Sequence, residues 1–127
     1  MTHNPRVLLV DGDEVVRASL SKALLDRDVF CDAAVSARDA LVQLGQRRYA
    51  LLLLHLEMTG SEGVLDCIRS LRQSHRPMVL MTANVRSPKD AIDTELVQII
   101  IRRPMKIAEV AGMIQACLEF VPEIEDS

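Results

Sequence analysis

The sequence predicts a single α/β domain in three layers, with a parallel sheet between two layers of helices. Short apolar runs recur five times, amphipathic segments separate them, and 127 residues suffice for one domain but not for two. The apolar fraction of 49% is enough for a sizeable core. Strands that alternate with helices form right-handed crossovers, which place helices on both faces of the sheet.

The five predicted strands are short and rich in leucine or β-branched residues. Several are apolar throughout, which is typical of strands buried on both faces of a parallel sheet. They cover residues 6–10, 29–33, 50–54, 78–82 and 97–101.

The segments between them predict five helices, each with one apolar face. Ser36 suits the N-cap of the second helix. The fourth helix, near residues 88–95, is the shortest; Ser87 can cap it and Pro88 suits its first turn. The apolar faces of the other four are Val16, Leu20, Ala23 and Leu24; Ala37, Ala40, Leu41 and Leu44; Val64, Ile68 and Leu71; and Ile107, Val110, Ile114 and Cys117.

Charge and composition exclude several classes of protein. A net charge of −3 offers no basic surface for nucleic acid or for an anionic membrane. The polar N-terminus has no signal-peptide core, and no apolar run approaches the roughly 18 residues of a membrane span. Three cysteines without metal-type spacing read as reduced core residues. We therefore expect a cytoplasmic protein, with a folded domain over residues 1–121 and a disordered acidic tail over 122–127.

Polar residues follow four of the predicted strands. In an open parallel sheet the functional crevice lies beyond the carboxyl ends of the strands, so these residues should converge. They are Asp11, Gly12 and Asp13 after the first strand, His55 after the third, Thr82 after the fourth and Arg103 after the fifth.

Four motifs in this order resemble the receiver domain of response regulators, the phosphoacceptor module of two-component signalling. They are VLLVDGDE, YALLLLHLEMTGSEG, PMVLMTA and IIIRRPMK, and the resemblance covers roughly residues 5–120. It implies a flavodoxin-like (βα)5 three-layer sandwich whose parallel sheet has the strand order 2-1-3-4-5.

The resemblance also implies a chemistry from which this sequence departs. In the family, two adjacent acids hold Mg²⁺, an aspartate after the third strand accepts the phosphoryl group, and a hydroxyl and a lysine bind the phosphoryl oxygens. Asp11 matches the first acid and Thr82 the hydroxyl. The second acid falls on Gly12, the phosphoacceptor on His55 and the lysine on Arg103.

Two further family positions lie on or after the fifth strand. The aromatic switch residue falls on Ile100, which is stiff at χ1 and is expected to stay inward and packed. The Lys-Pro bond of the family is usually cis, so Arg103–Pro104 is expected to be cis as well.

Charge arithmetic predicts weak or absent Mg²⁺ binding, and hence no cofactor. The family pocket has three carboxylates and one lysine, a surplus that a hard divalent cation neutralises. Asp11, Arg103 and a titratable His55 form an inner pocket that is neutral or slightly positive without metal. We expect Asp11 to pair internally with Arg103 or His55, because a buried charge must be paired. Asp13 is an alternative metal ligand.

His55 has three interpretations. The first is a structural side chain, hydrogen-bonded within a pocket that no longer accepts a phosphoryl group. The second is a phosphohistidine, although without metal the attacking group would lack electrostatic help. The third is a transition-metal site formed with Asp11 and Asp13.

The favoured function is a pseudo-receiver, a non-enzymatic module that signals through protein–protein contact without phosphorylation. Its partner, a protein or a second copy, would bind the face of the fourth helix, fifth strand and fifth helix, roughly residues 90–112. The main alternative is a functional receiver that is phosphorylated at His55 or uses Asp13 as a substitute metal ligand. A flavodoxin-like enzyme or nucleotide binder is disfavoured, because no glycine-rich phosphate loop follows the first strand.

Overall fold

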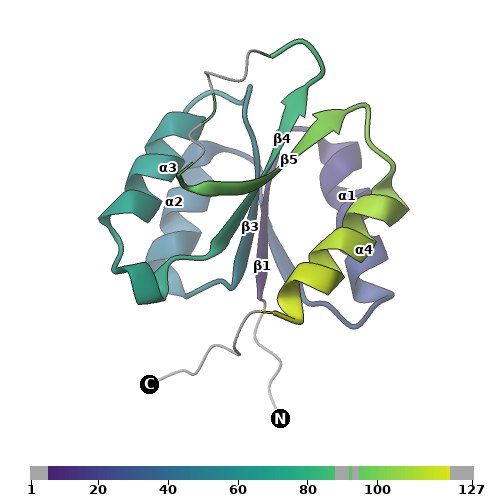
Figure 1. Ribbon diagram of the computed structural model, residues 1–127, viewed down its shortest axis with the longest axis horizontal. Helices are drawn as coiled ribbons and strands as arrows, with labels where there is room; N and C mark the ends of the chain where they lie inside the picture. Colours follow the sequence, from purple (N-terminus) through teal and green to yellow (C-terminus); the bar gives the residue numbers. More distant parts are fainter. Residues whose placement is uncertain (1–5, 88–91, 93–94, 121–127) are drawn as a thin grey trace.

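A computed structural model describes residues 6–87, 92 and 95–120 of the chain. Its centre is a five-stranded parallel sheet in the order β2-β1-β3-β4-β5, as predicted (Figure 1). The strands are β1 (Val7–Val10), β2 (Cys31–Ala34), β3 (Leu51–His55), β4 (Met78–Asn84) and β5 (Val97–Arg103). The fold is therefore the flavodoxin-like sandwich expected from the sequence.

Helices cover both faces of the sheet. In Figure 1, α2 and α3 lie on one face, and α1 and α4 lie on the other. The helices are α1 (Glu14–Leu25), α2 (Ala37–Gln46), α3 (Ser61–Ser70) and α4 (Ile107–Leu118), with a 3-10 turn η1 (Gln73–His75) before β4. The helix predicted near residues 88–95 and the tail 122–127 lie largely or wholly outside the described residues.

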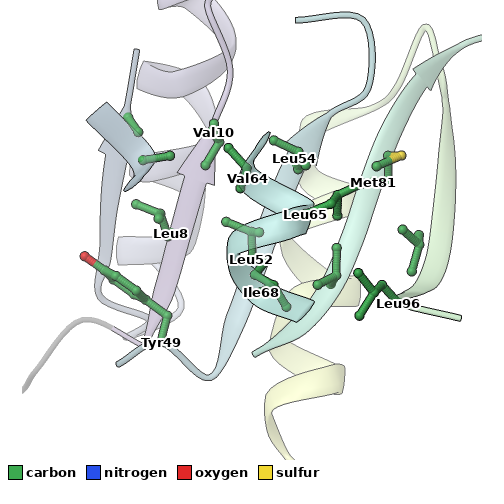
Figure 2. Close-up of a cluster of buried hydrophobic side chains, with 14 of the residues drawn as sticks. Leu8, Val10, Tyr49, Leu52, Leu54, Val64, Leu65, Ile68, Met81 and Leu96 are labelled. Carbon is green, nitrogen blue, oxygen red and sulfur yellow. The ribbon is translucent and has the colours of Figure 1, made fainter. Parts of the chain in front are cut away.

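Alternation along the strands divides the core into two clusters. Leu8, Leu52 and Leu54 point toward α2 and α3, where they meet Ile68 and other side chains of α3 (Figure 2). Their strand neighbours Val7, Leu9, Leu51 and Leu53 point toward α1 and α4. Because both faces are covered, the strands are apolar on both sides, which explains the unbroken leucine run of β3.

The predicted boundaries of the strands differ from the observed ones by one to two residues. β2 begins two residues later than predicted, and β4 and β5 each extend two residues further than predicted and pair as far as Asn84 and Arg103. Polar side chains continue these strands because the backbone ladder does not depend on apolar burial. The extension carries Arg103 beyond the apolar core to the polar edge of the sheet.

The N-cap predicted at Ser36 is confirmed, and Asp13 caps the first helix. The side chain of Asp13 accepts hydrogen bonds from the backbone N–H groups of Val15 and Val16, and Ser36 Oγ accepts from Asp39 N at 3.1 Å. Gly60 begins α3 with φ of 86°, and a Cβ there would lie 2.8 Å from the Cβ of Ala37. Only glycine fits this turn, which returns the chain from the end of β3 to the face of the sheet.

Candidate functional site

The carboxyl ends of β1, β3, β4 and β5 bring the predicted polar residues together. His55 is in register with Thr82 across β3 and β4, and Arg103 is in register with Asn84 across β4 and β5. Asp11 follows β1 directly and is 6% exposed. The convergence results from the parallel register, which aligns the strand ends at one edge.

The Asp11 carboxylate is fully engaged within the protein. Its Oδ1 accepts the backbone N–H of Asp13 at 2.9 Å, and its Oδ2 forms an ion pair with Nη2 of Arg103. The Arg17 guanidinium donates to the Asp11 carbonyl at 2.8 Å, which fixes the backbone at this position. A carboxylate out of water needs such partners, and Arg103 is one of the two internal partners, with His55, expected from the sequence.

Arg103 also reaches the hydroxyl of Thr82. Its Nη2 lies 3.2 Å from Thr82 Oγ1, and Thr82 is 1% exposed. The Arg103 side chain is itself 18% exposed. One guanidinium therefore joins a carboxylate from β1 and a hydroxyl from β4.

His55 lies between two carboxylates. Its Nδ1 is 3.8 Å from Asp11 Oδ1, and its Nε2 is 3.2 Å from Glu57 Oε1. The Nε2 atom is buried and makes no hydrogen bond of good geometry within the described part of the chain. The imidazole thus lies between two carboxylates, and its Nε2 lacks a well-aligned partner among the described residues.

Glu57 is a member of the site that the sequence analysis missed. Its Oε1 accepts the backbone N–H of Asn84 at 2.9 Å, and its Oε2 accepts the hydroxyl of Ser87. Burial opposes ionisation of this carboxyl, but these two hydrogen bonds and the neighbouring His55 together lower its pKa. The available signal was an acid two residues beyond the exit of β3, at the edge where the other polar residues gather.

Gly12 has no side chain to offer the pocket, and the Asp13 side chain serves the start of α1. A Cβ at Gly12 would meet only the carbonyl oxygen of Val35, at 3.9 Å, so the position has room for a side chain. Asp13 uses its Oδ1 to cap α1, with Val15 N at 2.9 Å. Among the described residues, no group of three or more histidine, cysteine or acidic side chains is arranged to hold a metal ion.

Of the two family positions on or after β5, one agrees with the expectation from the sequence and the other does not. The Arg103–Pro104 peptide bond is cis, the isomer expected from the sequence. Ile100, however, is 36% exposed, so the expectation that it is packed inward is wrong. A bulge opposite Val79 and Leu80 sets the alternation of β5 so that Ile99 and Ile101 face α1 and α4, which turns Ile100 to the other side of an edge strand.

Comparison with known proteins decides the family. The family model named "Response regulator receiver domain" matches residues 7–115 of the sequence. The chain belongs to this family. Among solved structures, a CheY-like receiver domain protein from Methanospirillum hungatei superposes with a TM-score of 0.79 at 20% identity, covering 93% of this chain and 97% of that one.

Curated relatives share part of the receiver domain sequence. The transcriptional regulatory protein AfsQ1 of Streptomyces coelicolor is 30% identical over 79 residues, which are 62% of this chain and 35% of that protein. The response regulator protein FleR of Pseudomonas aeruginosa is 38% identical over 80 residues, 61% of this chain and 17% of that protein. The chain thus spans about a third or less of the curated relatives it matches.

Glu57 changes the charge arithmetic of this receiver pocket. Asp11, Arg103 and His55 alone sum to zero, or to one positive charge when the imidazole is protonated. Glu57 adds one negative charge 3.2 Å from His55, so the four groups sum to one negative charge or to zero. The expectation of a neutral or slightly positive pocket therefore holds only for the three inner groups.

Proposed function

We propose that this receiver domain is a pseudo-receiver, which signals through protein–protein contact without becoming phosphorylated. The observation that carries the proposal is the position of Arg103, whose Nη2 contacts both the Asp11 carboxylate and the Thr82 hydroxyl. In the family's phosphorylation chemistry, the acid at the Asp11 position binds Mg²⁺ and the hydroxyl at the Thr82 position binds the phosphoryl oxygens. Here one internal cation occupies both.

The surrounding residues support the same function. His55 stands at the end of β3, and Gly12 offers no second carboxylate for a hard cation that prefers oxygen ligands. Receiver domains are signalling modules, and the proposed role needs neither Mg²⁺ nor another cofactor.

Two observations argue against the alternative of a phosphorylated site. Asp13, the candidate substitute ligand, caps α1 through its Oδ1. A phosphoryl group on Nε2 of His55 would enter the space that faces the Glu57 carboxylate, 3.2 Å away. Repulsion between these negative charges would disfavour transfer.

A titration with Mg²⁺ and beryllofluoride tests the proposal directly. We expect no saturable change in the amide chemical shifts of Asp11, Thr82 or Asn84 at a few millimolar Mg²⁺, with or without beryllofluoride. Saturable shifts centred on these residues would contradict phosphorylation independence. An authentic phosphorylatable receiver, treated in parallel, serves as the positive control.

Restoring aspartate at positions 12 and 55 tests which of the two missing carboxylates limits phosphorylation. We expect His55→Asp alone to accept little phosphoryl group from small-molecule donors, because the metal site stays incomplete. Gly12→Asp combined with His55→Asp should do markedly better, since both residues act in one site and Gly12 has room for a side chain. Gly12→Asp with His55→Asn is the matched control without the nucleophile. Equal rates for the single and double aspartate variants would show that the metal does not limit the reaction.

For the partner, the proposed contact surface is the face of the predicted fourth helix, β5 and α4, roughly residues 90–112, of which β5 and α4 are among the described residues. On this face the Lys106 and Glu109 side chains, at the start of α4, form an exposed ion pair at 3.9 Å, and Met113 further along α4 is 36% exposed. We expect Lys106→Glu to weaken binding of a partner protein, or self-association if the partner is a second copy. His55→Asn should leave binding nearly unchanged. A large loss from His55→Asn with none from Lys106→Glu would identify the pocket as the recognition site instead.

A further inference from the structure

The chain leaves β4 through a hydrogen-bonded turn at the edge of the candidate site. The backbone N–H of Ser87 donates to the carbonyl of Asn84 at 3.0 Å, which closes a four-residue turn. The two central residues point outward: Val85 is 66% exposed and Arg86 is also exposed. The turn follows Thr82 by two residues, so its geometry is tied to the position of β4 in the site.

Glu57 holds this turn from the side of the pocket. Its two carboxylate oxygens accept from Asn84 N and from Ser87 Oγ, the first and last residues of the turn. The same carboxylate faces Nε2 of His55. Glu57 therefore connects the end of β3 to the end of β4 across 27 to 30 residues of sequence.

Arg102 holds the turn from the side of β5. Its Nη1 donates to the carbonyl of Asn84 at 2.9 Å and to the carbonyl of Ser87 at 2.8 Å. The two ionised side chains thus act on the same two residues, Glu57 on their donors and Arg102 on their acceptors. Hydrogen bonds to ionised groups are stronger than those between neutral groups, and two anchors with several bonds leave the turn few alternative conformations.

We propose that Glu57 and Arg102 are positioning residues that clamp the turn 84–87, so that the exit of β4 keeps one conformation without a phosphoryl group. This inference rests on the proposed function, to which it adds the residues that fix the conformation. Arg103 binds Thr82 inside the pocket. Glu57 and Arg102 instead act on Asn84 and Ser87, so the clamp constrains the outer end of β4.

Amide hydrogen exchange of the full chain, read by NMR, tests the clamp. In Glu57→Ala and in Arg102→Ala we expect the amides of Asn84 and Ser87 to exchange about tenfold faster than in the unmodified chain, as the loss of one charged hydrogen-bond partner implies. The double variant should exchange more slowly than the product of the single effects predicts, because both residues hold the same turn.

Matched controls are available nearby. Glu62→Ala removes an exposed acid from the first turn of α3, and Arg86→Ala removes the exposed arginine of the turn itself. Both should leave the Asn84 amide within about twofold of its normal exchange rate. Protection of the Leu54 amide in the middle of the sheet reports whether each variant remains folded.

The outcomes separate the clamp from the proposed function. Unchanged exchange of Asn84 and Ser87 in both single variants, with Leu54 still protected, overturns the clamp. A saturable response of the unmodified chain to beryllofluoride and Mg²⁺ overturns the proposed function, whatever the exchange rates are. Faster exchange in the variants and no response to beryllofluoride support both.

Discussion

The two ends of β4 lie in different environments although they belong to one strand. Val79, Leu80 and Met81 are almost completely buried between the two helix layers. Thr82 and Asn84, one to three residues later, meet charged side chains from β5 and from the loop after β3. The apolar part follows the family pattern. The polar part keeps the family hydroxyl at Thr82, but that hydroxyl contacts Arg103, which stands where the family has a lysine.

The difference shows that the fold and the chemistry of this receiver domain depend on separate residues. Burial of apolar side chains is nearly additive and tolerates changes at the rim. The polar edge depends on pairing, so loss of one carboxylate requires changes in its neighbours. Arg103, His55 and Glu57 together form a consistent set of contacts around Asp11 and the end of β4.

The largest effect is expected in the apolar part. Leu54 is fully buried against the α3 layer, and Leu54→Ala should lower the free energy of unfolding by about 3 kcal/mol. Leu25→Ala, at a leucine that is 56% exposed, should cost less than about 1 kcal/mol. Urea unfolding of both variants measures the difference. Similar losses would mean that the sheet interior does not dominate stability.

A smaller loss is expected at the polar edge. Arg103→Met leaves the Asp11 carboxylate without its counter-charge and should cost about 2 kcal/mol, less than for a fully buried pair because Arg103 remains partly exposed. Adding Asp11→Asn should recover part of that loss, since the amide carries no charge. If the double variant is less stable than the sum of the single losses predicts, the ion pair is not the reason that Arg103 stabilises the fold.

Tyr49 tests a polar contact away from the site. Its hydroxyl donates to Asp32 Oδ2 at 2.5 Å. Burial is the larger cause and this hydrogen bond the next of a raised pKa of the Tyr49 phenol. The folded state therefore keeps the proton when the unfolded state loses it, so this contribution is complete below about pH 10 and is lost as the pH rises further. Tyr49→Phe should cost about 1 kcal/mol at pH 7 and should reduce the alkaline loss of stability, as measured by urea unfolding across pH. An unchanged alkaline slope would assign that loss to other groups.

The smallest effect should be a gain. Asp28 has φ of 60° in the loop after α1, a left-handed conformation that favours glycine. Asp28→Gly should raise the free energy of unfolding by about 0.5 kcal/mol. Asp26→Gly is the matched control, because Asp26 has φ of −61° and glycine there should be destabilising. Thermal unfolding distinguishes the two, and equal shifts of the same sign would exclude the backbone explanation.

The sequence by itself determined the five strands, the alternation with helices, the strand order through its family resemblance, and the residues at the strand ends. The strands and helices follow from apolar runs and periodicities, which depend on residues close together in the chain, whereas the strand order came from the family resemblance. Internal pairing of Asp11 with Arg103 or His55 was also predictable, because a buried carboxylate requires a nearby cation, but the structure decided that Arg103 forms the close ion pair.

Only the tertiary structure decided the roles of Glu57, Arg102 and Ile100. A glutamate two residues beyond a strand can point into solvent or across to another loop. The direction of the Glu57 side chain depends on the Asn84 N–H and the Ser87 hydroxyl, which lie at and just after the end of β4. Ile100 faces outward because a bulge changes the alternation of β5, and no local pattern predicts that bulge. Apolar periodicity fixes which elements form, whereas long side chains and strand irregularities take their direction from neighbours that are distant in the sequence.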